Sequence, residues 1–251
     1  MTDTGGRRVA LVTGSGRNIG RATALALAAD GCDIVVNVRT SVDEAKAVVA
    51  EVQETGARAI ISVGDVREPE AVKRMFDDAR SQLGPVSVLV NNAAVRPEQP
   101  IAELEFEEWH RIVGIVLDGA FLCAKAAVAH MRELGSGRII NLAGLSGQAG
   151  APDRVHVVTA KAGIIGLTKA LAVELAAERI TVNAVSPGMI GTRRQTSSSP
   201  GEPKHHERLH IPVGRRGTPD EVARVIAFLA SPDSGYITGH TLNVNGGAYI
   251  V

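Results

Sequence analysis

Short runs of β-branched and aliphatic residues alternate with longer alanine- and leucine-rich segments along the whole chain. The runs cover residues 8–13, 33–38, 57–62, 86–91, 138–143, 180–185 and 240–245. Strands that are apolar on both faces and separated by helices are typical of a parallel sheet with helices packed on both sides. The pattern therefore predicts an α/β fold with a doubly wound, seven-stranded parallel sheet.

The chain has the length of one large domain. Its 251 residues fit a single α/β domain, and no Pro/Gly/Ser-rich linker divides it, so we expect one domain over residues 1–251. The polar, proline-containing segment at about 193–217 breaks the alternation. Segments of this kind are usually functional, so we interpret it as a substrate lid, with a disordered surface insertion as the alternative. His205, His206 and His210 within it lack ligand-spaced cysteines or carboxylates, and we predict no metal site.

Charge and cysteine content narrow the function classes. Basic and acidic residues balance at 27 each, which argues against nucleic acid as a partner and favours a small-molecule substrate. Cys32 and Cys123 lie in separate apolar segments, as buried packing residues of a reducing compartment do. The start MTDTGGRR is polar, and we find no apolar run of membrane-spanning length. We therefore expect a soluble cytoplasmic protein without a membrane partner.

A glycine loop follows the first predicted strand and leads directly into a helix. In this context the backbone and the helix N-terminus can approach a pyrophosphate. The loop from Thr13 to Gly20 resembles the T-G-x-x-x-G-x-G loop of the short-chain dehydrogenase/reductase family, with Gly14 and Gly20 in place. Asn18 stands where the middle glycine is expected, and asparagine tolerates the left-handed backbone region better than most residues.

Further motifs extend this resemblance over the whole chain. Asp65-Val66 follows the third predicted strand, Asn91-Asn92-Ala93-Ala94 ends the fourth, Pro187 to Thr192 ends the sixth, and Tyr236 to Gly239 is similar to the family's C-terminal segment. Five motifs in the right order identify the chain as similar to this family, and in particular to its 3-oxoacyl-[acyl-carrier-protein] reductases. The resemblance implies a Rossmann-type fold and an oxidoreductase.

The resemblance also implies an assembly. Members of the family pack two long helices against symmetry mates. The corresponding segments here run from about Phe106 to Met131 and from about Val155 to Ala177. We therefore expect a homotetramer.

A nicotinamide dinucleotide is the implied cofactor. The motifs place its contacts at Gly14, Arg17, Asn18, Ile19, Gly20, Arg39, Asp65, Val66, Asn92, Lys161, Pro187, Gly188, Ile190 and Thr192. An acid at the end of the second strand would accept the ribose 2′-hydroxyl and repel a 2′-phosphate. The stretch from Asn37 to Thr40 has no acid, whereas Arg39 and Arg17 offer guanidinium groups. NADP(H) is therefore favoured over NAD(H).

The catalytic side chains of the family are mostly replaced. Lys161 matches the family's lysine, which holds the ribose hydroxyls and lowers the pKa of a tyrosine four residues earlier. Val157 stands in that tyrosine's place, Gly144 in the serine's and Val116 in the asparagine's. The enoyl-reductase branch has its tyrosine seven residues before the lysine, which gives Arg154 here. Standard tyrosine catalysis is therefore excluded on this alignment.

Other residues could take over the roles of the family's tyrosine and serine. His156 adjoins the empty position, and an imidazole with a pKa of about 6.5 suits proton transfer, although neighbouring helical residues point in different directions. Ser146 could supply a hydroxyl if its loop bends inward, and Asp153 and Arg154 could orient a polar substrate. The alternative is that these four residues have no catalytic role and are ordinary residues of a loop or a helix start.

Three functions stay open at this point. The first is an oxidoreductase with an atypical site, acting on a carbonyl or secondary alcohol, because a bound nicotinamide carries the hydride chemistry itself. The second is a catalytically silent dinucleotide-binding sensor or partner subunit. The third is a lyase or isomerase that reuses the pocket without redox chemistry. The substrate itself is not encoded in any motif that we can read.

Overall fold

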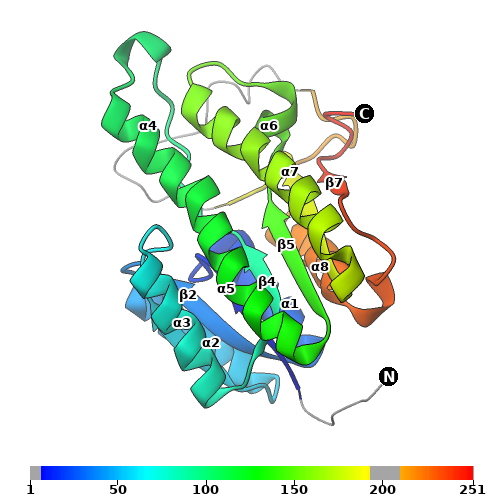
Figure 1. Ribbon diagram of the computed structural model, residues 1–251. Helices are drawn as coiled ribbons and strands as arrows, with labels where there is room; N and C mark the ends of the chain where they lie inside the picture. Colours follow the sequence, from blue (N-terminus) through cyan, green and yellow to red (C-terminus); the bar gives the residue numbers. More distant parts are fainter. Residues whose placement is uncertain (1–6, 193–209, 251) are drawn as a thin grey trace.

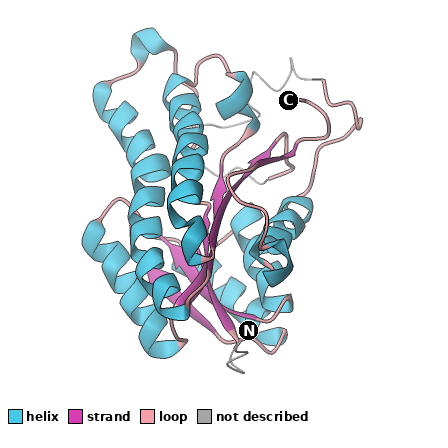
Figure 2. Cartoon of the chain, turned by 45° about the vertical axis from the view of Figure 1, so that its right-hand side comes forward, coloured by secondary structure: helices cyan, strands magenta, loops and turns pink. Residues whose placement is uncertain are grey.

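The computed structural model describes residues 7–192 and 210–250, which form one seven-stranded parallel sheet flanked by helices (Figures 1 and 2). The strand order is β3-β2-β1-β4-β5-β6-β7. The strands are β1 (Arg8–Val12), β2 (Cys32–Val38), β3 (Ala59–Val63), β4 (Val86–Asn91), β5 (Gly137–Leu142), β6 (Ile180–Pro187) and β7 (Thr241–Val244). The predicted fold class is confirmed, and the predicted strands agree within two residues at each end.

Helices cover both faces of the sheet. One face carries α1 (Asn18–Ala29), α2 (Val42–Glu54) and α8 (Pro219–Ala230). The opposite face carries α3 (Pro69–Gln82), α5 (Gly119–Leu134) and α7 (Val155–Leu175). Shorter elements are η1 (Ile101–Glu103), α4 (Phe106–Val113), the π-helical turn η2 (Gly114–Asp118), α6 (Leu145–Ala149), η3 (Ala176–Glu178) and η5 (Pro232–Ser234).

The central strand β1 shows why the strands read as continuous apolar runs. Ala10 and Val12 belong to the apolar cluster under α1, α2 and α8, whereas Val9 and Leu11 belong to the cluster on the opposite face. Successive strand residues point to opposite faces, so a strand covered on both sides must be apolar at every position. All four residues are buried. Cys32 in β2 and Cys123 in α5 are also buried, and both are free cysteines, as predicted.

Two helices on the second face are apolar over an unusual length. The segments Phe106–Leu134, which runs through α4, η2 and α5, and Val155–Glu178 are long and apolar enough to cross a membrane. We predicted no apolar run of this length from the sequence, where charged residues such as Asp118 and Lys161 interrupt both segments. Within an apolar 18-residue stretch of each segment, 50% of the first stretch and 39% of the second are buried inside the molecule. Core helices of doubly wound domains have this composition because one side of each packs on the sheet.

Only one of two capping boxes forms as its spacing suggests. Thr218 accepts a hydrogen bond from the Glu221 N–H at the start of α8, and the Glu221 carboxylate accepts one from the Thr218 N–H. Ser41 and Glu44 have the same spacing at the start of α2, but Ser41 makes no capping hydrogen bond with its side chain. Glu44 instead lies 3.7 Å from Arg17 Nη1 across the neighbouring loop.

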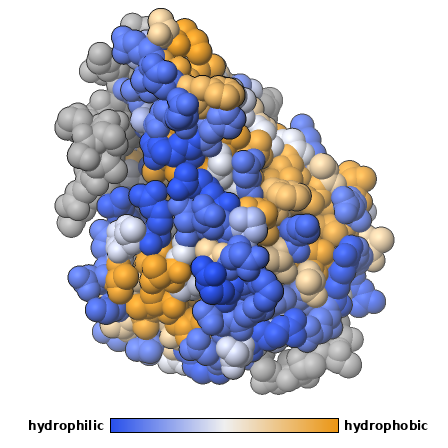
Figure 3. All heavy atoms as spheres, turned by 60° about the vertical axis from the view of Figure 1, so that its left-hand side comes forward, coloured by the Kyte–Doolittle hydropathy of each residue, from blue (hydrophilic) through white to orange (hydrophobic). Residues whose placement is uncertain are grey.

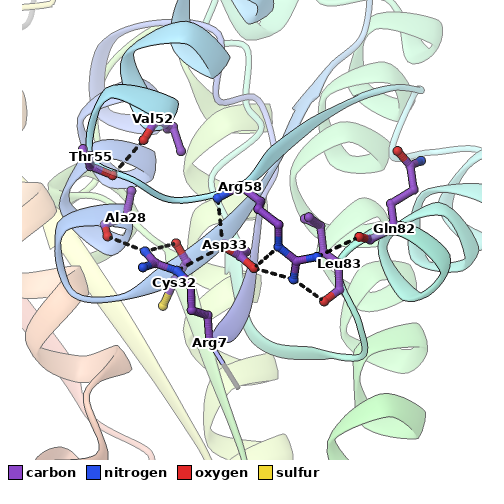
Figure 4. Close-up of polar contacts among 9 residues, drawn as sticks. All are labelled: Arg7, Ala28, Cys32, Asp33, Val52, Thr55, Arg58, Gln82 and Leu83. Carbon is purple, nitrogen blue, oxygen red and sulfur yellow. Dashed lines mark hydrogen bonds and ion pairs between the residues drawn. The ribbon is translucent and has the colours of Figure 1, made fainter. Parts of the chain in front are cut away.

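A buried carboxylate holds the amino-terminal end of the sheet together (Figure 4). The fully buried Asp33 of β2 accepts hydrogen bonds from the N–H and Nε of Arg58, at 2.9 and 2.8 Å, and pairs with Arg7 Nε at 3.1 Å. The Arg58 guanidinium also donates to the carbonyls of Gln82 and Leu83 after α3. This network lies at the end of the sheet opposite the glycine loop and serves the fold.

Candidate active site

A cleft of about 670 Å³ opens at the carboxyl ends of the strands. In the strand order, β1 lies between β2 and β4, so the chain reverses its direction of winding there. Ligands of open α/β sheets bind at this switch point. All of the predicted cofactor contacts line this one cleft: Gly14, Arg17, Asn18, Ile19, Gly20, Arg39, Asp65, Val66, Asn92, Lys161, Pro187, Gly188, Ile190 and Thr192.

The glycine loop is shaped by close backbone packing. A Cβ on Gly20 would lie 2.5 Å from the carbonyl oxygen of Gly14, which leaves no room for a side chain. Gly14 itself has a φ of 62°, and Asn18 has a φ of 50° at the start of α1. Asparagine is one of the few residue types that adopt this region readily, so the expected tolerance at Asn18 is confirmed. The loop can therefore bring backbone N–H groups and a helix start up to a pyrophosphate.

Two asparagines fasten this loop to the sheet. The Asn92 side chain donates to the carbonyls of Thr13 and Gly14 at 2.8 and 2.9 Å, so its amide supports the loop from β4. Asn37 Oδ1 accepts from the Gly14 N–H at 3.1 Å, and its amide donates to the carbonyls of Ser62 and Gly64. We did not single out Asn37. Its signal was a polar side chain within an otherwise apolar strand run.

Charged residues line the part of the cleft next to the glycine loop, which we call the adenosine half, or cofactor half. Arg17 and Arg39 are both exposed there, and Glu44 lies beside Arg17. Asp65 pairs with Arg67, with Nη2 and Oδ2 2.7 Å apart. This hydrogen bond from Arg67 holds the pKa of Asp65 below its usual range against the opposing effect of partial burial. The glycine cradle and the cations Arg17 and Arg39 fit a dinucleotide. Arg67, which we did not single out from the sequence, is not among the cleft-lining residues but pairs with Asp65, which is.

Lys161 lies deep in the other half of the cleft. It is 6% exposed, and its Nζ donates a hydrogen bond to the carbonyl of Leu142 at the end of β5. Burial, with smaller contributions from the positive charges of Arg96 and Arg154, lowers the pKa of Lys161 to about 7. At neutral pH this side chain therefore exchanges readily between ammonium and amine.

Close contacts determine where Lys161 stands. A Cβ on Gly147 of α6 would lie 2.8 Å from the Cβ of Lys161, and one on Gly163 would lie 2.8 Å from Leu117 of η2. Two turns further along α7, Thr168 accepts a hydrogen bond from Asn141, which in turn accepts one from Asn91, both at 2.9 Å. Because this buried chain joins β4, β5 and α7, it sets the register of α7 on the sheet.

The three positions that we aligned with the family's tyrosine, serine and asparagine differ in their relation to the cleft. Val157 is buried and lines the cleft one turn before Lys161. Gly144 also lines the cleft, with a φ of 141° that side chains rarely adopt, although no heavy atom lies within 4 Å of its would-be Cβ. Val116 packs within η2 against Ala120 and Ile164 and is not among the cleft-lining residues.

The residues that could replace the family's tyrosine and serine differ in their position relative to the cleft. His156 is fully buried, and it is not among the residues that line the cleft. Its ring nitrogens have no hydrogen-bond partner among the described residues, and burial lowers its pKa. Ser146 does line the cleft, as does Arg154, which is 4% exposed. The geometry therefore gives His156 no direct route to a substrate and places Ser146 and Arg154 beside one.

Most of the predicted lid lies outside the described residues. This applies to positions 193–209, including His205 and His206. His210 is described and exposed. Within residues 7–192 and 210–250 there is no cluster of three metal-ligating side chains.

Comparisons with known proteins agree with this geometry. A family model described as enoyl-(acyl carrier protein) reductase matches residues 14–249. The 3-oxoacyl-[acyl-carrier-protein] reductase of Synechocystis is 43% identical over 241 residues, which cover 96% of each chain. The acetoacetyl-CoA reductase of Rhizobium meliloti is 42% identical, covering 96% of this chain and 98% of its own. The crystal structure of an acetoin dehydrogenase from Salmonella typhimurium superposes with a TM-score of 0.87 at 36% identity, covering 96% of this chain and 95% of its own.

Proposed function

Because the chain belongs to the short-chain dehydrogenase/reductase family, we propose that it is an NADP(H)-dependent oxidoreductase that interconverts a carbonyl and a secondary alcohol. One observation supports this above all others: a single cleft holds both the glycine loop and the buried Lys161. The similar curated proteins are reductases of 3-oxoacyl and acetoacetyl groups, which favours the direction of carbonyl reduction.

Residues of the adenosine half hold the cofactor. Gly14 and Gly20 would let the backbone approach the pyrophosphate, and Arg17 and Arg39 would bind a ribose 2′-phosphate, which would favour NADP(H). When bound, this cofactor supplies the hydride. Glu44, 3.7 Å from Arg17, moderates the positive charge at that position.

Lys161 supplies the proton that the family takes from its tyrosine. With a pKa of about 7 it is substantially protonated at neutral pH, and its ammonium can donate a proton to the substrate oxygen as that oxygen gains negative charge. The resulting amine takes a proton back from solvent. Val157 leaves an apolar wall beside this reaction, which excludes water and keeps the local dielectric low.

The test is NADPH consumption by the purified protein over a panel of ketones and 3-oxoacyl thioesters, with the alcohol product quantified. We expect one alcohol formed for each NADPH consumed. Tight NADPH binding in calorimetry without any turnover would contradict an enzymatic role and support the silent sensor or partner subunit. The nonpolar positions Gly144 and Val157 are the observation that keeps this second function in view. Conversion that proceeds without nicotinamide would instead indicate a lyase or isomerase.

The proposal includes a homotetramer formed through the apolar helices on the second face. Phe106, Phe121, Val155 and Val173 are exposed there, and Val173 of α7 is 84% accessible. Figure 3 shows how apolar surface on one side of the molecule lies in separate patches between polar ones. We expect a tetramer in light scattering and a smaller species for Val173→Asp. A wild-type monomer would contradict the proposal.

A further inference from the structure

The substrate half of the cleft is lined by cations. Arg96, Arg111 and Arg154 line it together with Lys161. The lining carboxylates among the described residues are Glu44 and Asp65, and these belong to the adenosine half, where each lies next to an arginine. The described residues that line this half therefore include cations and no carboxylate, a composition that hydride transfer to a neutral ketone does not require.

Arg154 is held in the cleft wall by an unusual turn. It is the N-cap residue of α7 and is almost completely buried. The preceding residue, Asp153, has a φ of 57°, a conformation that few non-glycine residues adopt and that costs free energy. Residues in such conformations cluster at functional sites because the surrounding structure must hold them there.

The same turn brings Arg96 close to Arg154. The Gln99 N–H donates to the Asp153 carbonyl at 2.6 Å, which joins the segment after β4 to the start of α7. Arg96 lies three residues before this bond and Arg154 one residue after it. Both also contribute positive potential at Lys161, where each lowers the pKa of the ammonium. The two guanidinium groups therefore share one region of the cleft.

Each of the three arginines already has a partner within the chain. Arg111 is held by a bidentate pair with Glu108, with both hydrogen bonds at 2.6 Å. Arg96 and Arg154 each interact with another group of the chain as well. A guanidinium has five N–H donors, so it can keep one protein contact and still donate two parallel hydrogen bonds to a ligand carboxylate.

We propose that the physiological substrate carries a carboxylate, which Arg154 and Arg96 bind while the carbonyl to be reduced faces Lys161. This inference rests on the proposed carbonyl reduction and specifies its substrate class as an oxo acid or the corresponding hydroxy acid. A bound carboxylate also offsets the positive charge at Lys161. Substrate binding therefore raises the pKa of Lys161 and keeps the proton donor charged when it is needed.

The first experiment compares acids with their uncharged esters. NADPH-dependent kcat/KM is measured for pyruvate, acetoacetate and levulinate and for their methyl esters, a series that varies the distance from carboxylate to carbonyl. Charged hydrogen bonds of this kind lead us to expect a preference for the best acid over its ester of about 10- to 100-fold. The preference should collapse in Arg154→Gln and weaken in Arg96→Gln, and it should persist in Arg224→Gln, which changes an exposed arginine of α8.

The second experiment does not depend on turnover. Butyrate and butyramide, which have no ketone, are titrated into the NADP-saturated protein by calorimetry. We expect butyrate to bind more tightly than butyramide in the wild type and in Arg224→Gln, and the difference to disappear in Arg154→Gln. If no carbonyl compound is reduced but butyrate still binds in this way, the proposed function fails and the anion site stands.

Two results would overturn the anion site. One is a wild-type protein that reduces the esters as well as the acids. The other is equal binding of butyrate and butyramide by the wild type. Neither result depends on a variant that has to fold, and the first leaves the proposed carbonyl reduction intact.

Discussion

The two halves of the cleft are built in different ways. The cofactor half is built mainly from backbone: a Cβ added to Gly14 or Gly20 would lie 3.0 or 2.5 Å from a neighbouring backbone atom, and Asn37 and Asn92 fasten the loop. In the substrate half, side chains decide the chemistry, and we propose from the alignment that these side chains differ from the family's set. A binding surface made of tightly packed backbone tolerates few substitutions. A reaction that depends on a few side chains can change when those side chains change, while the fold stays the same.

The largest effect is expected when the proposed proton donor of the substrate half is removed. Lys161→Met should lower kcat for carbonyl reduction by about 10²- to 10⁴-fold, the usual effect of a lost general acid. The protein should remain folded, because methionine suits a buried site better than an unpaired ammonium does. Steady-state kinetics test this, with Lys169→Met, an exposed lysine two turns along α7, as the control. Unchanged turnover in Lys161→Met would remove Lys161 from catalysis.

Restoring the family's phenol should act in the opposite direction. Val157→Tyr places a hydroxyl with a pKa of about 10 in the cleft, one turn from Lys161. It should raise the reduction rate at pH 9 by about tenfold or more, because a phenol is still protonated where Lys161 is mostly neutral. Val158→Tyr, whose side chain is outside the cleft lining, is the matched control. Equal rates for both variants would mean that the scaffold cannot use a donor at this position.

A third change tests whether the cofactor half depends on its backbone. Alanine normally stabilises a helix relative to glycine, but in Gly20→Ala the new Cβ would lie 2.5 Å from the Gly14 carbonyl oxygen. We expect NADPH affinity to fall by about tenfold, equivalent to about 1.4 kcal/mol, in a fluorescence titration. Gly166→Ala in α7 has nothing within 4 Å of its new Cβ and should bind NADPH normally. Similar affinities for the two variants would contradict a backbone-built cofactor half.

The smallest effect on turnover is expected far from both halves. Asp33→Asn removes the carboxylate that Arg7 and Arg58 share at the other end of the sheet (Figure 4). Loss of these charged hydrogen bonds should lower the free energy of unfolding by about 1–3 kcal/mol, measured by urea denaturation. The kcat of the folded protein should not change. A fall in kcat would show that the amino-terminal end of the sheet influences the cleft.

The strands and the cofactor contacts could be predicted because they depend on local sequence patterns. Alternation of strand and helix determined the sheet, and the spacing of Gly14, Asn18 and Gly20 identified the loop. The Ser-x-x-Glu spacing at Ser41 does not produce a capping box, because Glu44 lies beside Arg17, a residue from another loop. Spacing within one segment carries no information about such a partner.

The substrate half was predicted less completely for the same reason. The bond between Gln99 and Asp153 joins two segments that are remote in sequence and brings Arg96 to the region of Arg154. His156 was suggested by its place next to Val157 in sequence, yet the structure buries it outside the cleft lining. Position along the chain predicted which residues align with the family's catalytic set, but only the packing of α7 on the sheet shows which ones line the cleft.

The pH dependence of carbonyl reduction tests the role of Lys161 most directly. The measurement is kcat of the wild type at saturating NADPH with an uncharged ketone. A general acid works only when protonated, so we expect kcat to be constant well below the Lys161 pKa of about 7 and to fall above it. The fall should approach about tenfold per pH unit, and Val157→Tyr should move it to higher pH. A wild-type kcat that stays constant from about pH 6 to about pH 9 would contradict proton donation by Lys161.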